Sequence, residues 1–413
     1  MMAIMAAALL TASCARQQLS VEDLRVEHMQ NPSVVDATQP RLSWINTPKS
    51  QTARGLKQTA YRIVVATSMK KLQQGNYDLW DSGRQESDAS SLVAYQGKPL
   101  PSAQDCYWKV QTWDQDGKPS AWSKPARWGM GLLDAADWKA QWIAPSLDHA
   151  GAPLLRKQFD TRGKVKQAKV FVCGLGYFEL YVNGQRIGDD YLVPNMTDYT
   201  ERHDLDKGPI AIAGNMSGHR VMYLAYDVTK QLQKGRNALG VLLGNGFYDA
   251  LNLNIPLSHF GEKCLRLQLQ LTYTDGTTQT VCTDGTWQTK PSAITYNSVH
   301  GGEIYNANLE TPLWATTRDN SEGWQNVKTI EGPKAEMSAH TAPTDRIVET
   351  MKPISLTRRE DGAWIVDFGK EISGWIHFRD LKGTKGDTLK VDYMSESVQG
   401  NMRYVMNGSG NEE

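Results

Sequence analysis

Residues 177–202 read Y-F-E-L-Y-V-N-G-Q-R-I-G-D-D-Y-L-V-P-N-M-T-D-Y-T-E-R, and this stretch is the most informative part of the chain. Two alternating strand patterns flank Asn183-Gly184, a dipeptide that tolerates the positive φ angles of a tight hairpin turn. The stretch therefore predicts a β-hairpin followed by a polar loop. The loop carries acidic, amide and aromatic side chains, namely Asp189, Asp190, Tyr191, Asn195, Asp198 and Tyr199.

Strand patterns on both sides of this hairpin predict one large β domain. They cover residues 169–172, 178–182, 220–227, 237–243, 265–273 and 278–282. In residues 265–273 every second residue from Leu265 to Leu271 is a leucine. That alternation is typical of a strand with one apolar face.

An earlier module, residues 21–132, is also predicted to be all-β. Short runs rich in β-branched and aromatic residues recur at 41–44, 60–65 and 107–113. Its one helix-like segment is 68–74. Strand patterns resume after residue 347, at residues 364–368, 374–378 and 388–393.

Composition excludes some classes of function. The 413 residues are too many for one core and suggest roughly two to four domains. Lys+Arg and Asp+Glu both number 45, so no basic surface argues for nucleic acid binding. The 13 Trp and 16 Tyr suit either sandwich cores or surfaces that stack on sugars.

The cysteines do not predict disulfides or zinc. Cys264 and Cys282 flank a hairpin, and pairing Thr274 with Thr277 places Leu269 opposite Cys282. No C-x-x-C spacing is present. We expect these cysteines to act as small buried apolar residues.

The N-terminal residues predict export. Residues 3–10 form an apolar run that is too short to span a bilayer, and L-T-A-S-C follows it, ending at Cys14. This pattern resembles a lipoprotein signal, which implies lipidation of Cys14. The alternatives are an ordinary secretory signal and a start codon assigned too late. Either signal predicts a location in the periplasm or, as a lipoprotein, in the outer membrane of a Gram-negative bacterium.

Three motifs resemble the N-terminal domains of bacterial α-L-rhamnosidases of glycoside hydrolase family 78. They are residues 177–202, L-G-N-G-F-Y-D at residues 243–249, and D-F-G-K-E-I-S-G-W at residues 367–375. Trp44 and the Y-W-K-V-Q-T-W-D run at residues 107–114 also resemble a fibronectin type III domain.

The resemblance implies an all-β chain of tandem β-sandwiches. The expected parts are a signal peptide and linker (1–20), a fibronectin type III-like domain (21–135), a jelly-roll-type carbohydrate-binding sandwich (136–343) and an incomplete concanavalin-like sandwich (344–413). A sandwich with half of its strands exposes unpaired edges. We therefore expect the last part to be poorly stable alone.

The family's chemistry is an inverting hydrolysis that uses two carboxyl groups on an (α/α)6 barrel. No stretch of this chain has the sustained helical periodicity of such a barrel. Neither a nucleophile elbow, a zinc-protease motif nor a phosphate-binding loop is present in the sequence. We predict no catalytic residues and no required cofactor in this chain.

Sugar binding is the function that the resemblance implies for the second sandwich, in which some family members hold L-rhamnose at a calcium ion. The implied sugar-binding residues are Asp189, Asp190, Asn195, Asp198, Tyr199, Asn245, Tyr248 and Asp249. The implied calcium ligands are Asn245, Asp249 and Asn252. Two structural alternatives stay open: Asn183 as a hairpin residue, and Asn245 as a turn residue between two glycines.

The sequence thus predicts part of an exported α-L-rhamnosidase that acts on rhamnose-containing plant glycans or glycosides. Two alternatives stay open for this chain: a non-catalytic surface carbohydrate-binding protein, and an inert scaffold. In the scaffold alternative, Asp198 and Arg202 contact a neighbouring domain instead of a sugar.

Overall fold

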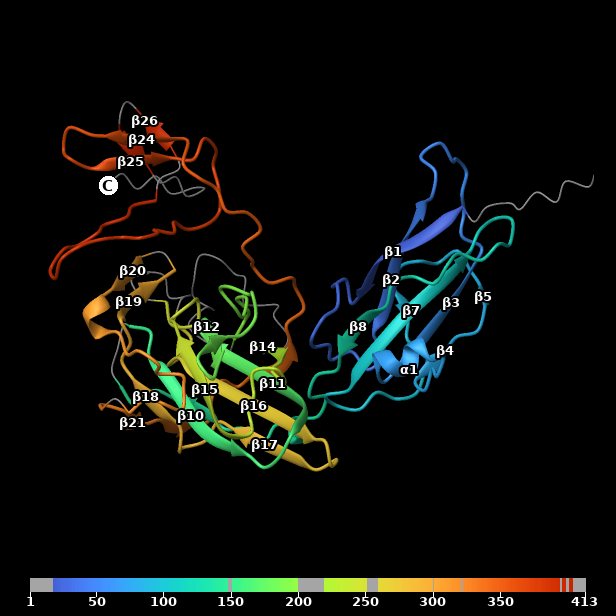
Figure 1. Cartoon of the computed structure of the whole chain (residues 1–413), viewed down its shortest axis with the longest axis horizontal. Helices are drawn as coiled ribbons and strands as arrows, with labels where there is room; N and C mark the ends of the chain where they lie inside the picture. The colour runs from blue at the N-terminus through green and yellow to red at the C-terminus, as the bar shows by residue number, and fades with distance from the viewer. Residues whose placement is uncertain are drawn as a thin grey trace, which may run out of the picture. The chain divides into compact units, whose positions relative to one another are not determined.

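The computed structural model describes residues 18–147, 151–199, 219–250, 259–299, 301–320 and 322–393, and the backbone of 396–398 and 401–403. Strands dominate the described residues, which confirms the predicted class of tandem β-sandwiches (Figure 1). The chain divides into two compact units, Met1–Arg346 and Ile347–Glu413. No described helix is long and apolar enough to cross a membrane.

The first module is a sandwich of two sheets. One sheet contains β1 (Leu19–Val26), β2 (Arg41–Pro48) and β6 (Val93–Ala94). The other contains β4 (Trp80–Asp81), β3 (Ala60–Ala66), β7 (Asp105–Trp113) and β8 (Ala126–Gly129), with β5 (Gln85–Glu86) also paired to β3. The core between the sheets includes Trp44, Ile63, Trp108 and Trp128.

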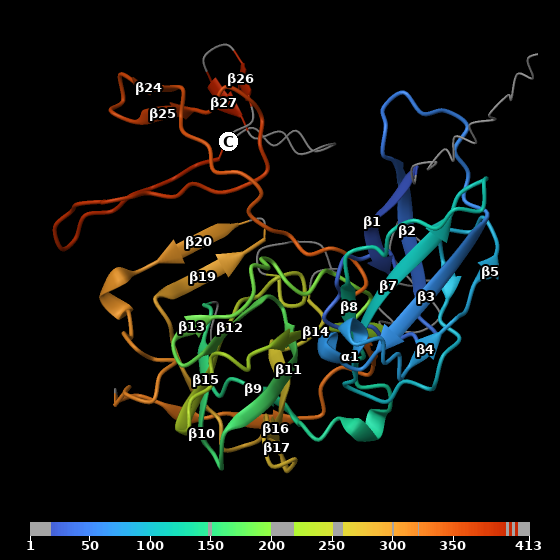
Figure 2. The same ribbon diagram turned by 45° about the vertical axis from the view of Figure 1, so that its right-hand side comes forward.

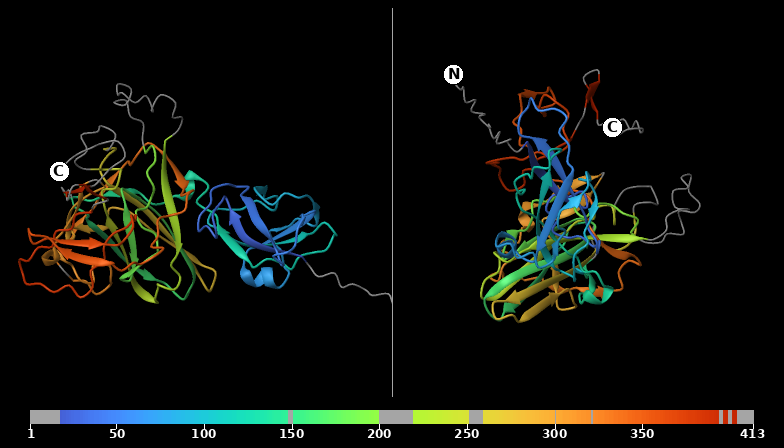
Figure 3. Two further views of the ribbon diagram at one scale, coloured as in Figure 1. Left: turned by 90° about the horizontal axis from the view of Figure 1, so that it is seen from above. Right: turned by 90° about the vertical axis from the view of Figure 1, so that its right-hand side faces the viewer.

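The helix-like segment of this module is α1 (Met69–Gln73), which confirms the prediction. Ser68 caps it, because its hydroxyl oxygen accepts a hydrogen bond from the backbone N–H of Lys71 at 3.3 Å. The buried side chain of Leu72 clusters with Val64 and Ala66 of β3, whereas Ile63 and Val65 of the same strand face the main core. The blue helix in Figure 3 is α1, which lies outside the sandwich against one of its sheets. A 3-10 helix (Ala135–Asp137) follows the module.

The second sandwich packs a six-stranded sheet against a seven-stranded sheet. The first has the order β13 (Gln185–Arg186), β12 (Phe178–Val182), β15 (Gly235–Leu243), β10 (Leu154–Thr161), β18 (Gln288–Lys290) and β21 (Gln325–Asn326). The second has the order β22 (Lys328–Ile330), β9 (Trp142–Ala144), β16 (Cys264–Tyr273), β11 (Val165–Leu175), β14 (Arg220–Asp227) and β23 (Glu336–Ala339), with β17 (Thr278–Cys282) paired to β16. A separate hairpin of β19 (Ile294–Ser298) and β20 (Gly302–Tyr305) leads to a 3-10 helix (Ala307–Leu309) (Figure 2).

The seven-stranded sheet is covered on both faces. Leu265, Leu267, Leu269 and Leu271 face the core between the two sheets, as their alternation predicts. The opposite face packs Phe171 and Cys264 against aromatic side chains and against Val34 and Leu132 of the first module. Because both faces are buried, β16 is a central strand of the molecule and not a half-exposed one.

The hairpin between β16 and β17 corrects the predicted register. Gln268 pairs with Cys282, whereas the sequence placed Leu269 there. The reason is a three-residue loop: the N–H of Tyr273 bonds the carbonyl of Thr277 at 2.9 Å, and Gly276 has a φ of +87°. The described cysteines are free.

In the second unit only one of the three predicted strands forms, at β25 (Trp364–Asp367), and the other strands lie elsewhere. β24 (Ser355–Arg358) pairs with β25, and β26 (Glu396–Val398) pairs with β27 (Asn401–Arg403). Residues 374–378 and 388–393 are not strands, because neither segment pairs with another described segment. Their apolar side chains consequently stay exposed, as with Trp375 and Phe378.

Candidate carbohydrate-binding site

The hairpin at the start of the first motif forms as predicted, with Asn183 and Gly184 at φ angles of +50° and +84°. Asn183 is a structural residue. Its Nδ2 donates to the carbonyl of Gln231 and to Oδ1 of Asn237, both at 2.8 Å. Its Oδ1 accepts from the N–H of Ala238 at 2.9 Å. Of the two interpretations of Asn183, the structure supports the hairpin residue.

Asp189 and Asp190 contact the segment that ends the first unit. Asp190 is buried, and its Oδ1 accepts a hydrogen bond from the hydroxyl of Thr344. The guanidinium of Arg346 lies 3.3 Å from Asp189 and 3.5 Å from Asp190. Burial, together with the Asp190 carboxylate, raises the pKa of Tyr226 well above its usual value. Asp190 therefore ties residues 344–346 to the loop, whereas Asp189 is exposed to solvent.

The end of the motif also engages internal partners. The backbone N–H of Asn195 donates to Nε2 of His340 at 3.3 Å. Oδ2 of Asp198 lies 2.7 Å from Nδ1 of His219, at an angle poorly aligned for a hydrogen bond. Asn195 and Asp198 both keep part of their surface exposed. Arg202 lies outside the described residues.

The predicted stacking residues Tyr199 and Tyr248 lie in the core. Their side chains are 1% and 4% exposed, and their ring centroids lie 5.2 Å apart in an edge-to-face contact. Phe260 completes the cluster, 5.0 Å from Tyr199. The expectation that these rings face a sugar is therefore wrong. Instead, the two rings pack together in the core and connect the first motif to the second. Tyr191 is half-buried, and the Arg186 guanidinium lies 4.3 Å from its ring centroid.

The second motif folds as a loop that packs backbone against backbone. A Cβ atom on Gly176 would meet the carbonyl oxygen of Asn245 at 1.8 Å, so only glycine fits there. Asn245 is fully buried; its N–H donates to Oδ1 of Asn297 and its Nδ2 donates to the Asn297 carbonyl, both at 2.7 Å. The carbonyl of Asn245 accepts from the N–H of Asp249 at 3.1 Å. Gly246 carries the positive φ of this loop, and Asn245 does not.

A buried lysine that sequence reasoning missed completes this loop. Lys263 is 3% exposed, and its Nζ donates to the carbonyl of Gly151 at 2.6 Å and to Oδ1 of Asn245. Asp249 lies nearby, raises the pKa of this lysine and pairs with Nδ1 of His259 at 2.9 Å. Burial has the larger effect and lowers the pKa of Lys263 to about 8. One available signal was a lysine two residues before the apolar strand 265–273.

Asn245, one of the three expected calcium ligands, is not placed to bind a calcium ion. Calcium takes about six to eight oxygen ligands, and here the Oδ1 of Asn245 faces an ammonium group instead. Among the described residues, no group of three His, Cys, Asp or Glu side chains could hold a metal. Asn252, the third expected ligand, lies outside the described residues, as does Cys14.

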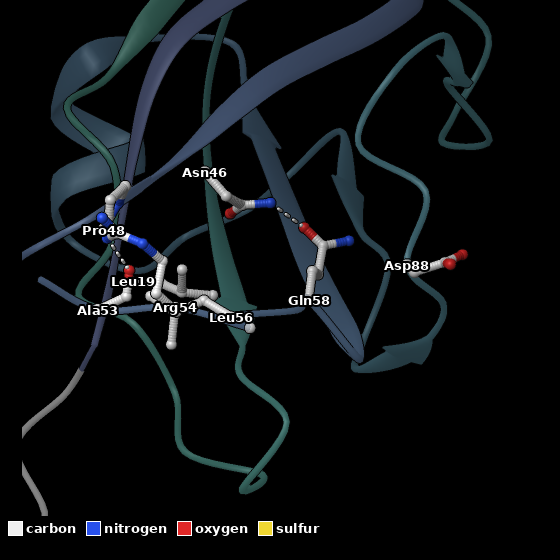
Figure 4. Close-up of a pocket in the computed structure, with 9 residues that line it drawn as sticks. Leu19, Asn46, Pro48, Ala53, Arg54, Leu56, Gln58 and Asp88 are labelled. Carbon is white, nitrogen blue, oxygen red and sulfur yellow. Dashed lines mark hydrogen bonds between the residues drawn. The ribbon is translucent and has the colours of Figure 1, made fainter. Parts of the chain in front are cut away.

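Two surface hollows lie elsewhere in the first unit. One, on the first module, is lined by Asn46, Gln58 and Arg54, among others (Figure 4). Gln58 is satisfied internally: its Oε1 accepts from Nε1 of Trp44 at 3.0 Å and from Nδ2 of Asn46 at 2.8 Å. The other lies on the six-stranded sheet around Arg156, which pairs with Asp319.

Comparison with known proteins identifies the family of this chain. A family profile described as "Rha78A-like, N-terminal immunoglobulin domain" matches residues 21–134. A second, described as "Alpha-L-rhamnosidase N-terminal domain", matches residues 163–208 and 216–349. An α-L-rhamnosidase of Formosa agariphila is 31% identical over 96% of this chain and 43% of its own length. The chain belongs to the α-L-rhamnosidase family.

Other α-L-rhamnosidases are also similar to this chain. One from Alteromonas sp. is 31% identical over 84% of this chain and 37% of its own length. The solved α-L-rhamnosidase of Dictyoglumus thermophilum superposes with a TM-score of 0.73 at 32% identity, covering 85% of this chain and 38% of that one. The enzyme of Streptomyces avermitilis, solved with L-rhamnose, superposes with a TM-score of 0.74 at 22% identity, covering 85% of this chain and 49% of that one. The chain matches the N-terminal part of these proteins and spans less than half of their length.

Proposed function

We propose that this chain supplies the accessory β domains of an α-L-rhamnosidase, and that the second sandwich binds L-rhamnose. The whole enzyme would hydrolyse terminal α-L-rhamnosyl linkages in plant glycans or glycosides. The observation that carries the proposal is the match to curated α-L-rhamnosidases over 96% of the chain. The L-rhamnose in the structure of the Streptomyces avermitilis relative supports the choice of sugar.

The accessible part of the first motif is the proposed contact surface for the sugar. Asp189 is exposed, and Asn195 and Asp198 keep part of their surface exposed, so their oxygens can accept hydrogen bonds from sugar hydroxyls. Asp190, Tyr199, Asn245, Tyr248 and Asp249 would act indirectly, by holding the two loops.

The proposal assigns hydrolysis to parts of the enzyme other than these domains. The longest described helix has five residues, which gives no support to a helical barrel within the described ranges. The proposal further places the enzyme outside the cytoplasm, in the periplasm or, through Cys14, on the outer membrane as a lipoprotein.

Titration of the purified chain with L-rhamnose tests binding, with calcium and separately with a chelator. We expect saturable binding that weakens severalfold in an Asp189→Ala, Asn195→Ala double variant. Gln185→Ala, an exposed change on the neighbouring strand β13, is the matched control. Hydrolysis of an aryl rhamnoside is measured in parallel, and we expect none.

The second function is that of a scaffold without sugar affinity. The observation that favours it is the internal engagement of Asp190, Asn245 and Asp249. Absence of any rhamnose binding at millimolar sugar would support this alternative and contradict binding by the sandwich. Turnover of the aryl rhamnoside would contradict the assignment of catalysis to other parts of the enzyme.

A further inference from the structure

The side chain of Lys263 places a positive charge against the Leu243–Asp249 loop. Lys263 immediately precedes β16, a central strand, and the side chain turns into the interior, where it is 3% exposed. Its Nζ meets two oxygens from different segments, the carbonyl of Gly151 and Oδ1 of Asn245. A buried ammonium is costly unless such oxygens replace its water.

The carboxamide of Asn245 is held in place by further hydrogen bonds of the same residue. Asn245 uses its N–H and Nδ2 on Asn297 and its carbonyl on the N–H of Asp249, so its orientation is fixed with Oδ1 toward the lysine. The carboxylate of Asp249 raises the pKa of Lys263 through its charge. One positive charge is therefore enclosed by two uncharged oxygens and a nearby carboxylate.

This donor set is of the type that calcium uses: carboxamide, carboxylate and backbone oxygens. A calcium ion needs such oxygens at about 2.3–2.6 Å, and it cannot share them with an ammonium group already at hydrogen-bond distance. We propose that the ammonium of Lys263 takes the place of a calcium ion in the Leu243–Asp249 loop, so that this loop is held together without metal.

The hydrogen-bonding pattern agrees with this arrangement. Both partners of the Lys263 Nζ are oxygen acceptors, which suit an ammonium group because it can only donate. The nearby carboxylate of Asp249 is shared with the ring of His259, an exposed group on the solvent side. Lys263 holds the loop in this way whether or not the sandwich binds a sugar.

Thermal unfolding of the full chain at neutral pH tests the proposal. We expect the same midpoint in excess calcium and in excess EGTA. Lys263→Met keeps a side chain of similar length but removes its charge. We expect this substitution to lower the midpoint by roughly 4 °C or more. Lys328→Met is the matched control, since that lysine is exposed and pairs with Glu262 on the surface.

A wild-type midpoint that rises in calcium and falls in EGTA would overturn the proposal. So would a Lys263→Met protein as stable as the Lys328→Met control. If Lys263→Met does not fold, the two wild-type measurements still decide. Neither measurement involves rhamnose, so failure here is distinguishable from failure of the proposed sugar binding.

Discussion

Tyr223, in β14, joins the two modules of the first unit through its hydroxyl group. That hydroxyl donates to Oδ1 of Asp36 at 2.5 Å and accepts from the backbone N–H of Leu132 at 3.0 Å. The other carboxylate oxygen of Asp36 accepts from the N–H of Ala339 at 2.5 Å. Burial raises the pKa of Asp36, and the hydrogen bonds from Tyr223 and Ala339 act in the opposite direction.

Replacing Tyr223 by Phe is expected to destabilise the first unit. The substitution keeps the ring but leaves the buried N–H of Leu132 and the half-buried carboxylate of Asp36 each short of one partner, which costs about 1–3 kcal/mol. Urea unfolding followed by tryptophan fluorescence measures the loss. Tyr61→Phe removes the same atom from a half-buried ring of β3, and equal midpoints for the two variants would contradict the role of Tyr223.

Sequence reasoning at the residue scale worked where the chemistry is local. The hairpin role of Asn183 was predictable because its positive φ angle depends on the Asn183-Gly184 turn itself. Its side-chain hydrogen bonds, to Gln231, Asn237 and Ala238, join segments that are remote in sequence. Lys263 was missed because burial of a lysine depends on Gly151 and Asn245, which are remote in sequence. Tyr199 and Tyr248 were misplaced for the same reason, since either ring suits a core or a sugar.

At the scale of elements, the outer face of the six-stranded sheet is covered by the loop of residues 306–320. Gly240 of β15 lies under this loop: a Cβ atom there would come within 2.6 Å of the Trp314 ring and 2.7 Å of Ala315. Trp314 in turn packs edge-on against Tyr181 of β12, at 5.2 Å between centroids. The glycine thus sets how closely the loop approaches the sheet.

Gly240→Ala is therefore expected to displace Trp314 and to lower the stability of the second sandwich by about 1–3 kcal/mol, the usual cost of overpacking. The emission spectrum of the folded protein and its urea midpoint report the change. Gly163→Ala is the control, because its added Cβ would meet nothing closer than 3.8 Å. Indistinguishable results for the two variants would show that the loop is not fixed at Gly240.

Strands were predictable where alternation and turn chemistry act together. β12, β14 and β17 have the bounds that the sequence predicts, and the fold class is confirmed. The register of β17 was one residue wrong, because Asp275-Gly276 belongs to a three-residue loop that a two-residue turn pattern mimics. Residues 374–378 have a strand pattern without a partner, and pattern alone cannot supply one.

At the scale of the whole molecule, the two units differ in how they bury apolar side chains. Residues 18–346 contain the large cores of both modules. In the second unit Val348, Ile354 and Trp364 are 95%, 71% and 62% exposed. Little buried apolar area is available there to offset the entropy of an ordered chain.

Limited proteolysis of the full chain is expected to reflect this difference. We predict that the first cuts fall after residue 347 and that a fragment ending near residue 346 persists, because cleavage requires local unfolding. Mass spectrometry of the time course identifies the cut sites. Early cuts within β11 or β16 would contradict the prediction.

The bond between Asp36 and the N–H of Ala339 has a consequence for biosynthesis. A ribosome delivers the aspartate some three hundred residues before the amide that binds it. The first module can therefore form its own sheets during translation. The carboxylate of Asp36 stays hydrated until β23 of the second sandwich is synthesised and pairs in parallel with β14. In a nascent chain stalled before that strand, the first module should have its sheets but should lack the hydrogen bond between Asp36 and the N–H of Ala339.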